Sequence, residues 1–368
     1  MNFSKRLIES PYMHWAKTLQ AARFNLGNSG VSPYPLRELP VRLEDLELSG
    51  PSFYGWPPLQ SALAHHLGMP EDQVVHACGT SMANHLAMAV TVDPGDDVLI
   101  ERPTYELLIS TAEYLGARVR RFERRPENGW LPDLDELKRQ VRPETRLIVL
   151  SNLHNPSSGR IPDALLREIA SLADTVGASV LVDEVYLDAA FEDTPTTAAH
   201  LADNIVVTSS LTKVYGLSGI RCGWIIGNPE VVRRAWRLNN LFGVIPAHAA
   251  ERLTLAVLAN FGPIRDRAQR LLTINRKLLN AFLQSRKDLQ HTPHLHGTVA
   301  FPRLRRSSVE ALCDHLRKYQ ETTVVPGRFF ELPNHFRIGI GCPTEILSEG
   351  LNRLGQGLDA IAATDGAG

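Results

Sequence analysis

Between residues 59 and 227 the chain alternates short apolar runs with amphipathic stretches. The apolar runs are rich in Val, Ile and Leu, and the amphipathic stretches have the spacing of helices with one buried face. We predict helices at 59–67, from Thr80 or Ser81 onward, at 105–115, 134–140 and 163–176, and strands at 74–76, 97–101, 117–122, 146–151, 179–183, 204–209 and 222–227. Continuous apolar strands separated by helices are typical of a mainly parallel sheet covered on both faces. The predicted fold class is therefore α/β.

Length and a change of pattern near Gly262 predict two domains. A chain of 368 residues is long enough for one large core and a smaller one. Residues 1–45 are irregular, so we expect an N-terminal arm and a segment of the small domain there. Residues 46–262 are expected to form the large domain, and residues 263–368 a smaller α/β domain. That smaller domain would begin with a long amphipathic helix.

Composition excludes several classes of partner. The net charge is −1, with 43% hydrophobic and 21% charged residues, which gives no field strong enough to attract nucleic acid or an anionic membrane. No apolar run approaches the roughly 18 residues of a membrane span, and residues 1–20 carry charges and a proline, so we expect a cytoplasmic protein. The four cysteines have no C-x-x-C spacing, so we expect neither a metal site nor disulfides.

The segment 209–224, S-S-L-T-K-V-Y-G-L-S-G-I-R-C-G-W, places Lys213 on a bend directly after a predicted strand. Gly216 and Gly219 interrupt any regular helix here. The hydroxyl of Ser210 and the guanidinium of Arg221 suit phosphate oxygens, which leaves the lysine free for covalent chemistry with an aldehyde. For the lysine alone, an exposed side chain in a glycine-rich loop is an equally good interpretation.

Two further polar segments follow predicted strands. Gly79, Thr80 and Ser81 stand at the start of a helix, where free backbone N–H groups and hydroxyls can bind phosphate or simply cap the helix. Tyr105 follows the next strand, at the edge of the sheet where ligands of open α/β proteins bind, and its ring could stack on a flat ligand or serve packing alone.

Asp183 is hard to explain by structure alone. It ends an apolar run, where burial would raise its pKa unless a cation accompanied it. A bound cation would compensate for this burial, and capping of the following segment is the alternative. Arg337 lies within another apolar run, where an amino acid's α-carboxylate would match its planar fork, and a salt bridge to a nearby Glu is the alternative.

Together these segments resemble, over roughly residues 24–358, the fold-type I pyridoxal-5'-phosphate (PLP) enzymes, in particular the class I and II aminotransferases similar to aspartate aminotransferase. The resemblance implies PLP as the cofactor and a seven-stranded type of sheet. It implies that Lys213 holds PLP covalently and acts as the base, and that Asp183 pairs with the ring nitrogen while Tyr105 covers the ring. Asn155, in an N-P-x-x-G loop, and Tyr186 would bind the phenolic oxygen.

The same resemblance assigns the remaining site residues. Gly79, Thr80, Ser81, Ser210 and Arg221 would seat the phosphate. Arg337, with Asn155, Gly27 and Asn28, would contact the substrate. Tyr54, in a Y-G-x-P segment, matches a family tyrosine that reaches the phosphate of the neighbouring subunit, which implies a homodimer with shared active sites.

Two departures from the family leave the reaction open. Asn28 and Ser29 stand where aminotransferases usually carry an apolar residue and a glycine, and residues 25–39 and 324–328 also resemble capreomycidine synthases, PLP enzymes that cyclise a hydroxylated arginine. We expect an aminotransferase acting on an α-amino acid and a 2-oxo acid; a PLP lyase or cyclase acting on a β-substituted amino acid is the alternative. A non-enzymatic sensor would require a regulatory domain, which we do not expect. Candidates for the side-chain pocket are His14, Trp15, Asn28, Asn239, Asn240 and Arg328.

Overall fold

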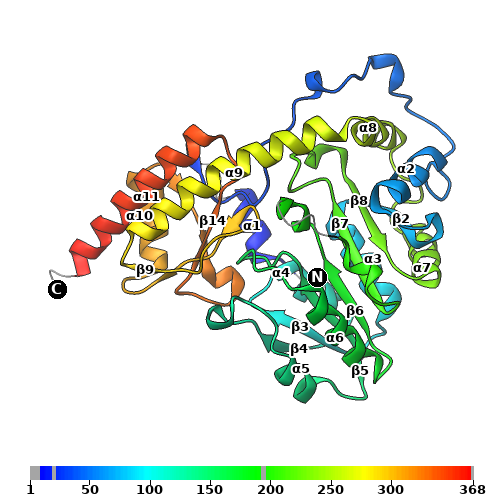
Figure 1. Cartoon of the computed structure of the whole chain (residues 1–368), viewed down its shortest axis with the longest axis horizontal. Helices are drawn as coiled ribbons and strands as arrows, with labels where there is room; N and C mark the ends of the chain where they lie inside the picture. The colour runs from blue at the N-terminus through cyan, green and yellow to red at the C-terminus, as the bar shows by residue number, and fades with distance from the viewer. Residues whose placement is uncertain (1–8, 19–21, 192–195, 366–368) are drawn as a thin grey trace, which may run out of the picture.

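A seven-stranded sheet is the centre of the protein, whose computed structural model describes residues 9–18, 22–191 and 196–365 (Figure 1). Across the sheet the strands run in the order β2 (Val74–Cys78), β8 (Cys222–Ile226), β7 (Ile205–Ser210), β6 (Ser179–Asp183), β5 (Thr145–Ser151), β3 (Asp97–Arg102) and β4 (Arg118–Glu123). β8 is antiparallel to both of its neighbours, and all other neighbouring strands are parallel. The predicted α/β class with a mainly parallel sheet is confirmed.

Helices cover both faces of this sheet because successive strand residues point to opposite sides. In β5, Leu147 and Val149 pack with helices α3 (Gly79–Thr91), α4 (Glu106–Tyr114) and α7 (Pro229–Asn239). Ile148 and Leu150 join the opposite core with α2 (Pro57–Leu67), α6 (Asp163–Asp174) and α9 (Phe261–Ser285). Helices α5 (Leu134–Gln140) and α8 (His248–Ala259) add Leu137 and Val257 to that second core.

The C-terminal part contains short strands and long helices. Strands β10 (Val299–Ala300), β14 (Phe336–Gly339) and β13 (Val325–Pro326) form one antiparallel sheet, and β9 (Leu289–Gln290) pairs with β11 (Arg303–Leu304). Helices α10 (Val309–Tyr319) and α11 (Thr344–Asp365) pack together beside them. Helix α9 extends from the large sheet to this part of the molecule (Figure 1). The division of the chain at residues 45 and 262 stays a prediction.

The N-terminal segment is more regular than the sequence predicted. Residues 11–18 form helix α1 (Pro11–Thr18), which lies between the large sheet and the sheet containing β14 (Figure 1). Strand β1 (Phe24–Asn25) pairs in parallel with β12 (Thr322–Thr323), so residues near the N-terminus complete a sheet whose other strand lies about 300 positions later. Eight residues are too few for hydrophobic periodicity to distinguish a helix from a loop.

Strands β5, β6 and β7 are parallel neighbours, so their carboxyl ends meet at one edge of the sheet. The residues at these three ends are Ser151, Asp183 and Ser210. None of the helices in the described ranges is long and apolar enough to cross a membrane. Those same ranges contain no cluster of three His, Cys, Asp or Glu side chains arranged to hold a metal ion.

Candidate active site

A cavity of about 500 Å³ opens at this edge of the sheet. Among its lining residues are twelve that the sequence singled out: Gly27, Asn28, Thr80, Ser81, Tyr105, Asn155, Asp183, Tyr186, Ser210, Lys213, Arg221 and Arg337. Of the candidates for the side-chain pocket, Trp15 and Asn28 line the cavity, whereas His14, Asn239, Asn240 and Arg328 do not. The structure therefore gathers residues more than 300 positions apart into one site.

Lys213 lies in the turn that follows β7, with its amine inside the cavity. Its Nζ donates a hydrogen bond to Oγ of Ser29 at 3.2 Å. Burial lowers the pKa of Lys213, and the positive charges of Arg337 and Arg221 lower it as well. A lowered pKa increases the fraction of neutral amine, which is the form that attacks an aldehyde or accepts a proton.

Asp183 ends β6 and is buried, with 5% of its surface exposed. Its Oδ2 accepts a hydrogen bond from Asn84 Nδ2 at 2.8 Å, and its Oδ1 accepts one from the backbone N–H of Val185 at 3.0 Å. Burial still raises the pKa of Asp183 to about 6. The bond to Val185 is the capping contact that the sequence left open. The two hydrogen bonds and the positive charge of Lys213 lower the pKa of Asp183, but burial outweighs them.

The residues around Gly79 form a cradle for an anion. Thr80 Oγ1 donates to Ser210 Oγ at 2.8 Å, and Ser210 Oγ donates to Thr212 Oγ1 at 2.9 Å. Arg221 reaches over the start of α3 and donates to the carbonyl of Cys78. Gly79 has φ +74°, and a Cβ there would stand 2.3 Å from Nη2 of Arg221. A Cβ would displace the guanidinium from this helix N-terminus, and the positive φ is one that glycine adopts without strain.

Arg337 is an arginine held by neutral groups. It is 1% exposed, and Nη1 donates to Asn155 Oδ1 at 3.1 Å, while Nη2 donates to the hydroxyl of Tyr12 at 2.8 Å and to the carbonyl of Gly27 at 3.0 Å. Within the described ranges its buried Nε has no hydrogen-bond partner, and its other nitrogens donate to an amide, a hydroxyl and a carbonyl, none of them a carboxylate. A substrate carboxylate would supply the missing negative charge, so the alternative of a salt bridge to Glu does not describe this arginine.

Tyr105 and Tyr186 flank the cavity. Tyr105 precedes the first residue of α4, and its ring contacts that of Tyr12 edge-on, with 5.9 Å between centroids. The hydroxyl of Tyr186 donates to Ser29 Oγ at 2.9 Å. Burial raises the pKa of both phenols, so both are neutral donors at physiological pH.

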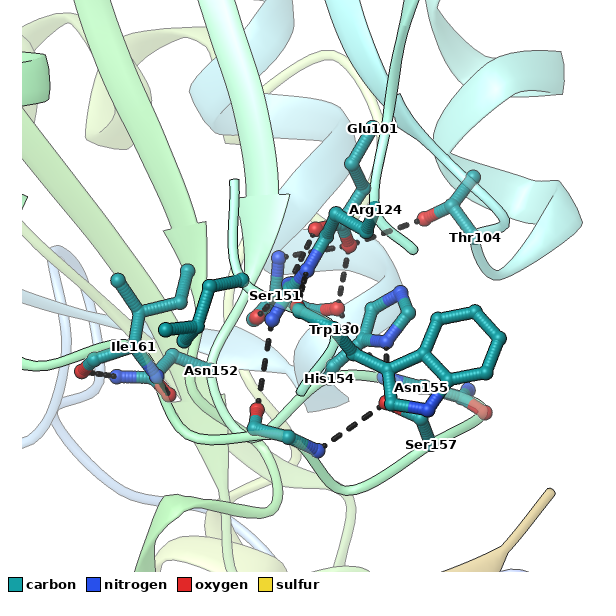
Figure 2. A network of polar contacts seen from close by, with 12 residues as sticks. Glu101, Thr104, Arg124, Trp130, Ser151, Asn152, His154, Asn155, Ser157 and Ile161 are labelled. Atoms are coloured by element: carbon teal, nitrogen blue, oxygen red, sulfur yellow. Dashed lines mark hydrogen bonds and ion pairs between the residues drawn. The ribbon is translucent and has the colours of Figure 1, made fainter. Parts of the chain in front are cut away.

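Behind the cavity a buried ion pair ties three strand ends together (Figure 2). Glu101 Oε2 and Arg124 Nη1 are 2.6 Å apart, and neither side chain is exposed to solvent. Glu101 Oε1 accepts from the backbone N–H and hydroxyl of Ser151 and from the hydroxyl of Thr104. The backbone N–H of Asn155 in turn donates to Ser151 Oγ at 3.2 Å. The pair therefore fixes two parts of the site: the loop that carries Asn155, and Thr104, which is the residue next to Tyr105.

Two predicted site residues, Gly79 and Tyr54, are not among the cavity's lining residues, and only Tyr54 lies apart from the site. It is 56% exposed and is not among the cavity's lining residues. Its ring packs edge-on against Trp236 with 6.2 Å between centroids, and its hydroxyl accepts a hydrogen bond from Asn240 at 3.4 Å. Its position outside the cavity is compatible with a role in a neighbouring subunit.

The sequence analysis did not assign Asn84, Thr212, Tyr12 or Ser29 to the site, although all of them line the cavity. Asn84 follows Thr80 by four positions on α3, so helical spacing from the predicted phosphate site could have identified it. Thr212 is adjacent to Lys213 and carries a hydroxyl suited to the same site. Ser29 was noted only as a departure from the family pattern, and Tyr12 gave no signal; the partners of Tyr12 and Ser29 lie 325 and 184 residues away in the sequence.

The residues present fit the expected cofactor. The cradle that a Cβ at Gly79 would fill suits a phosphate, and the buried carboxylate of Asp183 suits a protonated ring nitrogen. The amine of Lys213 lies in the same cavity and has a lowered pKa, as a group that condenses with an aldehyde requires.

Comparisons with known proteins identify the family of this chain. The sequence matches the family described as Aminotransferase class I and II over residues 46–354. It is 30% identical to a capreomycidine synthase from Streptomyces vinaceus over 355 residues, which cover 93% of this chain and 91% of that protein. A PLP-dependent aminotransferase from Streptococcus suis superposes with a TM-score of 0.89 at 26% identity, covering 97% of this chain and 99% of that one.

A solved PLP-dependent cyclase, OrfR, has a TM-score of 0.86 at 21% identity and covers 98% of this chain and 99% of that one, which shows a shared fold. The family match covers far more than half of the chain, and the relative from Streptomyces vinaceus covers nearly all of it. The protein therefore belongs to the class I and II aminotransferase family and is a PLP-dependent enzyme.

Proposed function

We propose that this enzyme is an aminotransferase that moves the amino group of an α-amino acid to a 2-oxo acid. The observation that carries the proposal is the convergence of Lys213, Asp183 and Arg337 on one cavity. Among the residues that the structure describes, Asp183 is the one carboxylate that lines the cavity. The described lining thus supplies the guanidinium of Arg337 for the substrate's α-carboxylate. It offers no second carboxylate that could pair with a positively charged side chain of the substrate.

In this proposal each polar group of the cavity has one task toward the cofactor. Thr80, Ser81, Ser210, Thr212 and Arg221 hold the phosphate, with Gly79 making room for Arg221. Asp183 pairs with the ring nitrogen, Asn155 and Tyr186 bind the phenolic oxygen, and Tyr105 covers the ring. When bound, PLP supplies an aldehyde for amines and a protonated ring that withdraws electrons from the substrate's Cα.

Lys213 and Arg337 act on the substrate. The planar fork of Arg337 binds the α-carboxylate, with Tyr12 and Asn155 fixing the guanidinium from two sides. A fixed carboxylate fixes the direction of the Cα–H bond. Nζ of Lys213, whose lowered pKa keeps more of it neutral, then takes the proton from Cα.

The covalent role of Lys213 has a direct test. Purified protein reduced with borohydride should carry one cofactor per chain, and peptide mass spectrometry should place it on Lys213. Lys213→Ala should fold, as judged by circular dichroism, and should show no such adduct. An adduct on another lysine would overturn this assignment.

A cyclase or lyase is the second candidate function, and the 30% identity to a capreomycidine synthase over 93% of the chain favours it. Such an enzyme would use the same residues but would expel a substituent from the substrate's β carbon. We would incubate the enzyme with single amino acids, with and without a 2-oxo acid, and identify the products. A new amino acid formed from the added oxo acid supports transamination, whereas loss of the β-substituent without consumption of the oxo acid supports the second candidate.

We also propose that the enzyme works as a homodimer in which Tyr54 reaches the phosphate of the neighbouring subunit. Large apolar side chains are exposed in two segments, among them Phe53 (76% exposed) and Leu241 (78% exposed). The hydrogen bond from Asn240 to Tyr54 places these segments side by side. An exposed apolar surface of this kind is typical of an interface between subunits.

A further inference from the structure

Ser29 is a buried hydroxyl that the proposed function leaves without a task. It is 5% exposed, and its Oγ accepts hydrogen bonds from Nζ of Lys213 at 3.2 Å and from the hydroxyl of Tyr186 at 2.9 Å. A serine hydroxyl can accept two hydrogen bonds, so these two donors use its full capacity as an acceptor. The hydroxyl of Ser29 thus contacts both the proposed base, Lys213, and a proposed ligand of the cofactor, Tyr186.

The backbone of the Ser29 loop is fixed by other bonds. Val31 N donates to the carbonyl of Lys213 at 2.7 Å, which ties the loop to the large sheet. Thr298 Oγ1 donates to the carbonyl of Ser29 at 2.7 Å, which ties it to the C-terminal part. Gly30 N donates to Asn28 Oδ1 at 3.0 Å within the loop. None of these bonds involves the hydroxyl of Ser29, so that hydroxyl can be removed while the bonds that hold the loop stay in place.

We propose that Ser29 is a positioning residue for Lys213, whose hydroxyl holds the free amine in the cavity and links it to Tyr186. The inference rests on the proposed function, in which Lys213 takes a proton from the substrate. The amine of Lys213 can make this hydrogen bond only when it is not bound covalently to the cofactor. The unbound amine is also the form that acts as a base. An acceptor at 3.2 Å both directs Nζ and stabilises its protonated form.

Several charged or titratable groups surround the amine and must stay constant in any test. They are Tyr12 on α1, Asp183 at the end of β6, Tyr186 after it, Arg221 before β8 and Arg337 on β14. A Ser29 variant leaves all of them in place. A change in the pKa of Lys213 in such a variant therefore reports on the hydroxyl.

The first measurement uses the protein freed of cofactor. Trace acetylation of Lys213 across a pH series, quantified by peptide mass spectrometry, gives the midpoint at which the amine becomes reactive. Ser29→Ala retains Cβ and removes the acceptor, so the protonated amine loses a partner and the midpoint should fall by about one pH unit. Ser29→Gly should give the same fall, and Ser29→Thr, which retains a hydroxyl, should keep the wild-type midpoint.

Thr298→Val is the matched control. It removes the hydrogen bond to the carbonyl of Ser29 and leaves the hydroxyl contacts in place, so its midpoint should stay at the wild-type value. In the loaded enzyme, Ser29→Ala should lower kcat about tenfold with little change in KM. Its pH profile should move to lower pH on the acid side, since the base loses its proton at a lower pH.

Two results would overturn the role of Ser29. One is an unchanged midpoint in Ser29→Ala, and the other is an equal shift in Thr298→Val, which would assign the effect to loop placement. The titration is made without cofactor, so it does not depend on the reaction type. A borohydride adduct found on a lysine other than Lys213 would instead overturn the role that the proposed function gives to Lys213.

Discussion

Asp183 has two hydrogen-bond donors and still has a raised pKa, because burial outweighs the bonds from Asn84 and Val185. The positive charge of Lys213 lowers this pKa too, but it does not offset burial, so a cation bound directly to the carboxylate would stabilise its charged form. In the proposed function that cation is the protonated ring of the cofactor. The charge of Asp183 should therefore matter more to the rate than the shape of its side chain.

Replacing Asp183 with Asn should retain the cofactor but lower kcat by several orders of magnitude, because a neutral amide cannot keep the ring nitrogen protonated. Steady-state kinetics and the absorbance of the bound cofactor would measure the two effects. Asp188→Asn is the matched control, since Asp188 is also an aspartate with a raised pKa, bonded to Tyr215 outside the cavity. Comparable losses of rate in both variants would contradict a special role for Asp183.

The same carboxylate predicts a pH dependence of stability. Its pKa rises from an ordinary 3.8 to about 6 on folding, so without cofactor the folded state binds this proton more tightly than the unfolded state does. This group therefore makes the fold less stable as the pH rises from about 4 to 6, by about 3 kcal/mol in all. A bound cation offsets that loss. The increase in Tm on cofactor binding should be larger at pH 7.5 than at pH 4.5.

Asp183→Asn supplies the comparison for this pH effect, because the amide does not titrate. In the variant, the increase in Tm on cofactor binding should depend less on pH than in the wild type. Differential scanning calorimetry at the two pH values measures both proteins. If the increase in Tm on cofactor binding depended on pH equally in the wild type and in Asp183→Asn, groups other than Asp183 would be its cause.

The residues predictable from the sequence are those whose local surroundings already imply a function. Lys213 stands on a glycine-rich bend and Asp183 ends an apolar strand, and both signals are contained within a few residues. Tyr12 and Ser29 acquire their roles only when distant segments meet. The hydroxyl of Tyr12 is a partner of Arg337 because α1 lies over the cavity, and no local pattern encodes that contact.

At the scale of elements, the carboxyl ends of parallel strands carry the site, and the buried pair of Glu101 and Arg124 connects three of them (Figure 2). Arg124 also donates to the carbonyls of Ser151 and Trp130. Every charge in this network is paired and hydrogen-bonded, which is the condition for tolerating ions away from water. The loop that carries Asn155 is held through it.

Glu101→Gln should lower the free energy of unfolding by about 3–5 kcal/mol, because Arg124 would be left buried without its counter-ion. Glu230→Gln is the matched control, since Glu230 and Arg233 form an exposed pair of the same residue types on α7. That variant should cost less than about 1 kcal/mol. Denaturant unfolding measures both, and equal costs would show that burial does not set the strength of the Glu101 pair.

The elements themselves were predictable where hydrophobic periodicity was long and regular. The alternation of apolar strands and amphipathic helices predicted the α/β class because each element buries one face in a shared core. The antiparallel direction of β8 was not predictable, since a fully buried strand has the same pattern in either direction. The two-residue pairing of β1 with β12 is too short to leave a periodic signal.

At the scale of the whole molecule, Tyr54 is fixed on a rigid support away from its own cavity. The hydroxyl of Ser52 and the backbone N–H of Trp56, on either side of Tyr54, both donate to Glu251 on α8. His248 also contacts Ser52 at 2.9 Å. A residue held this firmly by its neighbours, yet largely exposed itself, is suited to meet a surface outside its own chain.

Two arrangements of the same two lesions test whether Tyr54 serves the neighbouring subunit. In the first, Lys213→Ala chains are paired with Tyr54→Ala chains. If Tyr54 crosses the interface, one site of this mixed dimer collects both lesions and the other is wild type, so activity should reach about half of the wild-type value per dimer. In the second, a chain with both substitutions is paired with a wild-type chain. The single site that retains Lys213 then lacks the partner's Tyr54, so activity should match one Tyr54→Ala site.

The two arrangements give opposite results if Tyr54 serves its own chain. In that case the separated lesions leave only a Tyr54→Ala site, and the combined lesions leave one intact site in the wild-type chain. Differently tagged chains allow each mixed dimer to be purified, and assays at limiting cofactor are most sensitive to a lost phosphate contact. Because both mixed dimers contain the same substitutions in the same number, any difference in activity between them reports only on which subunit completes the site.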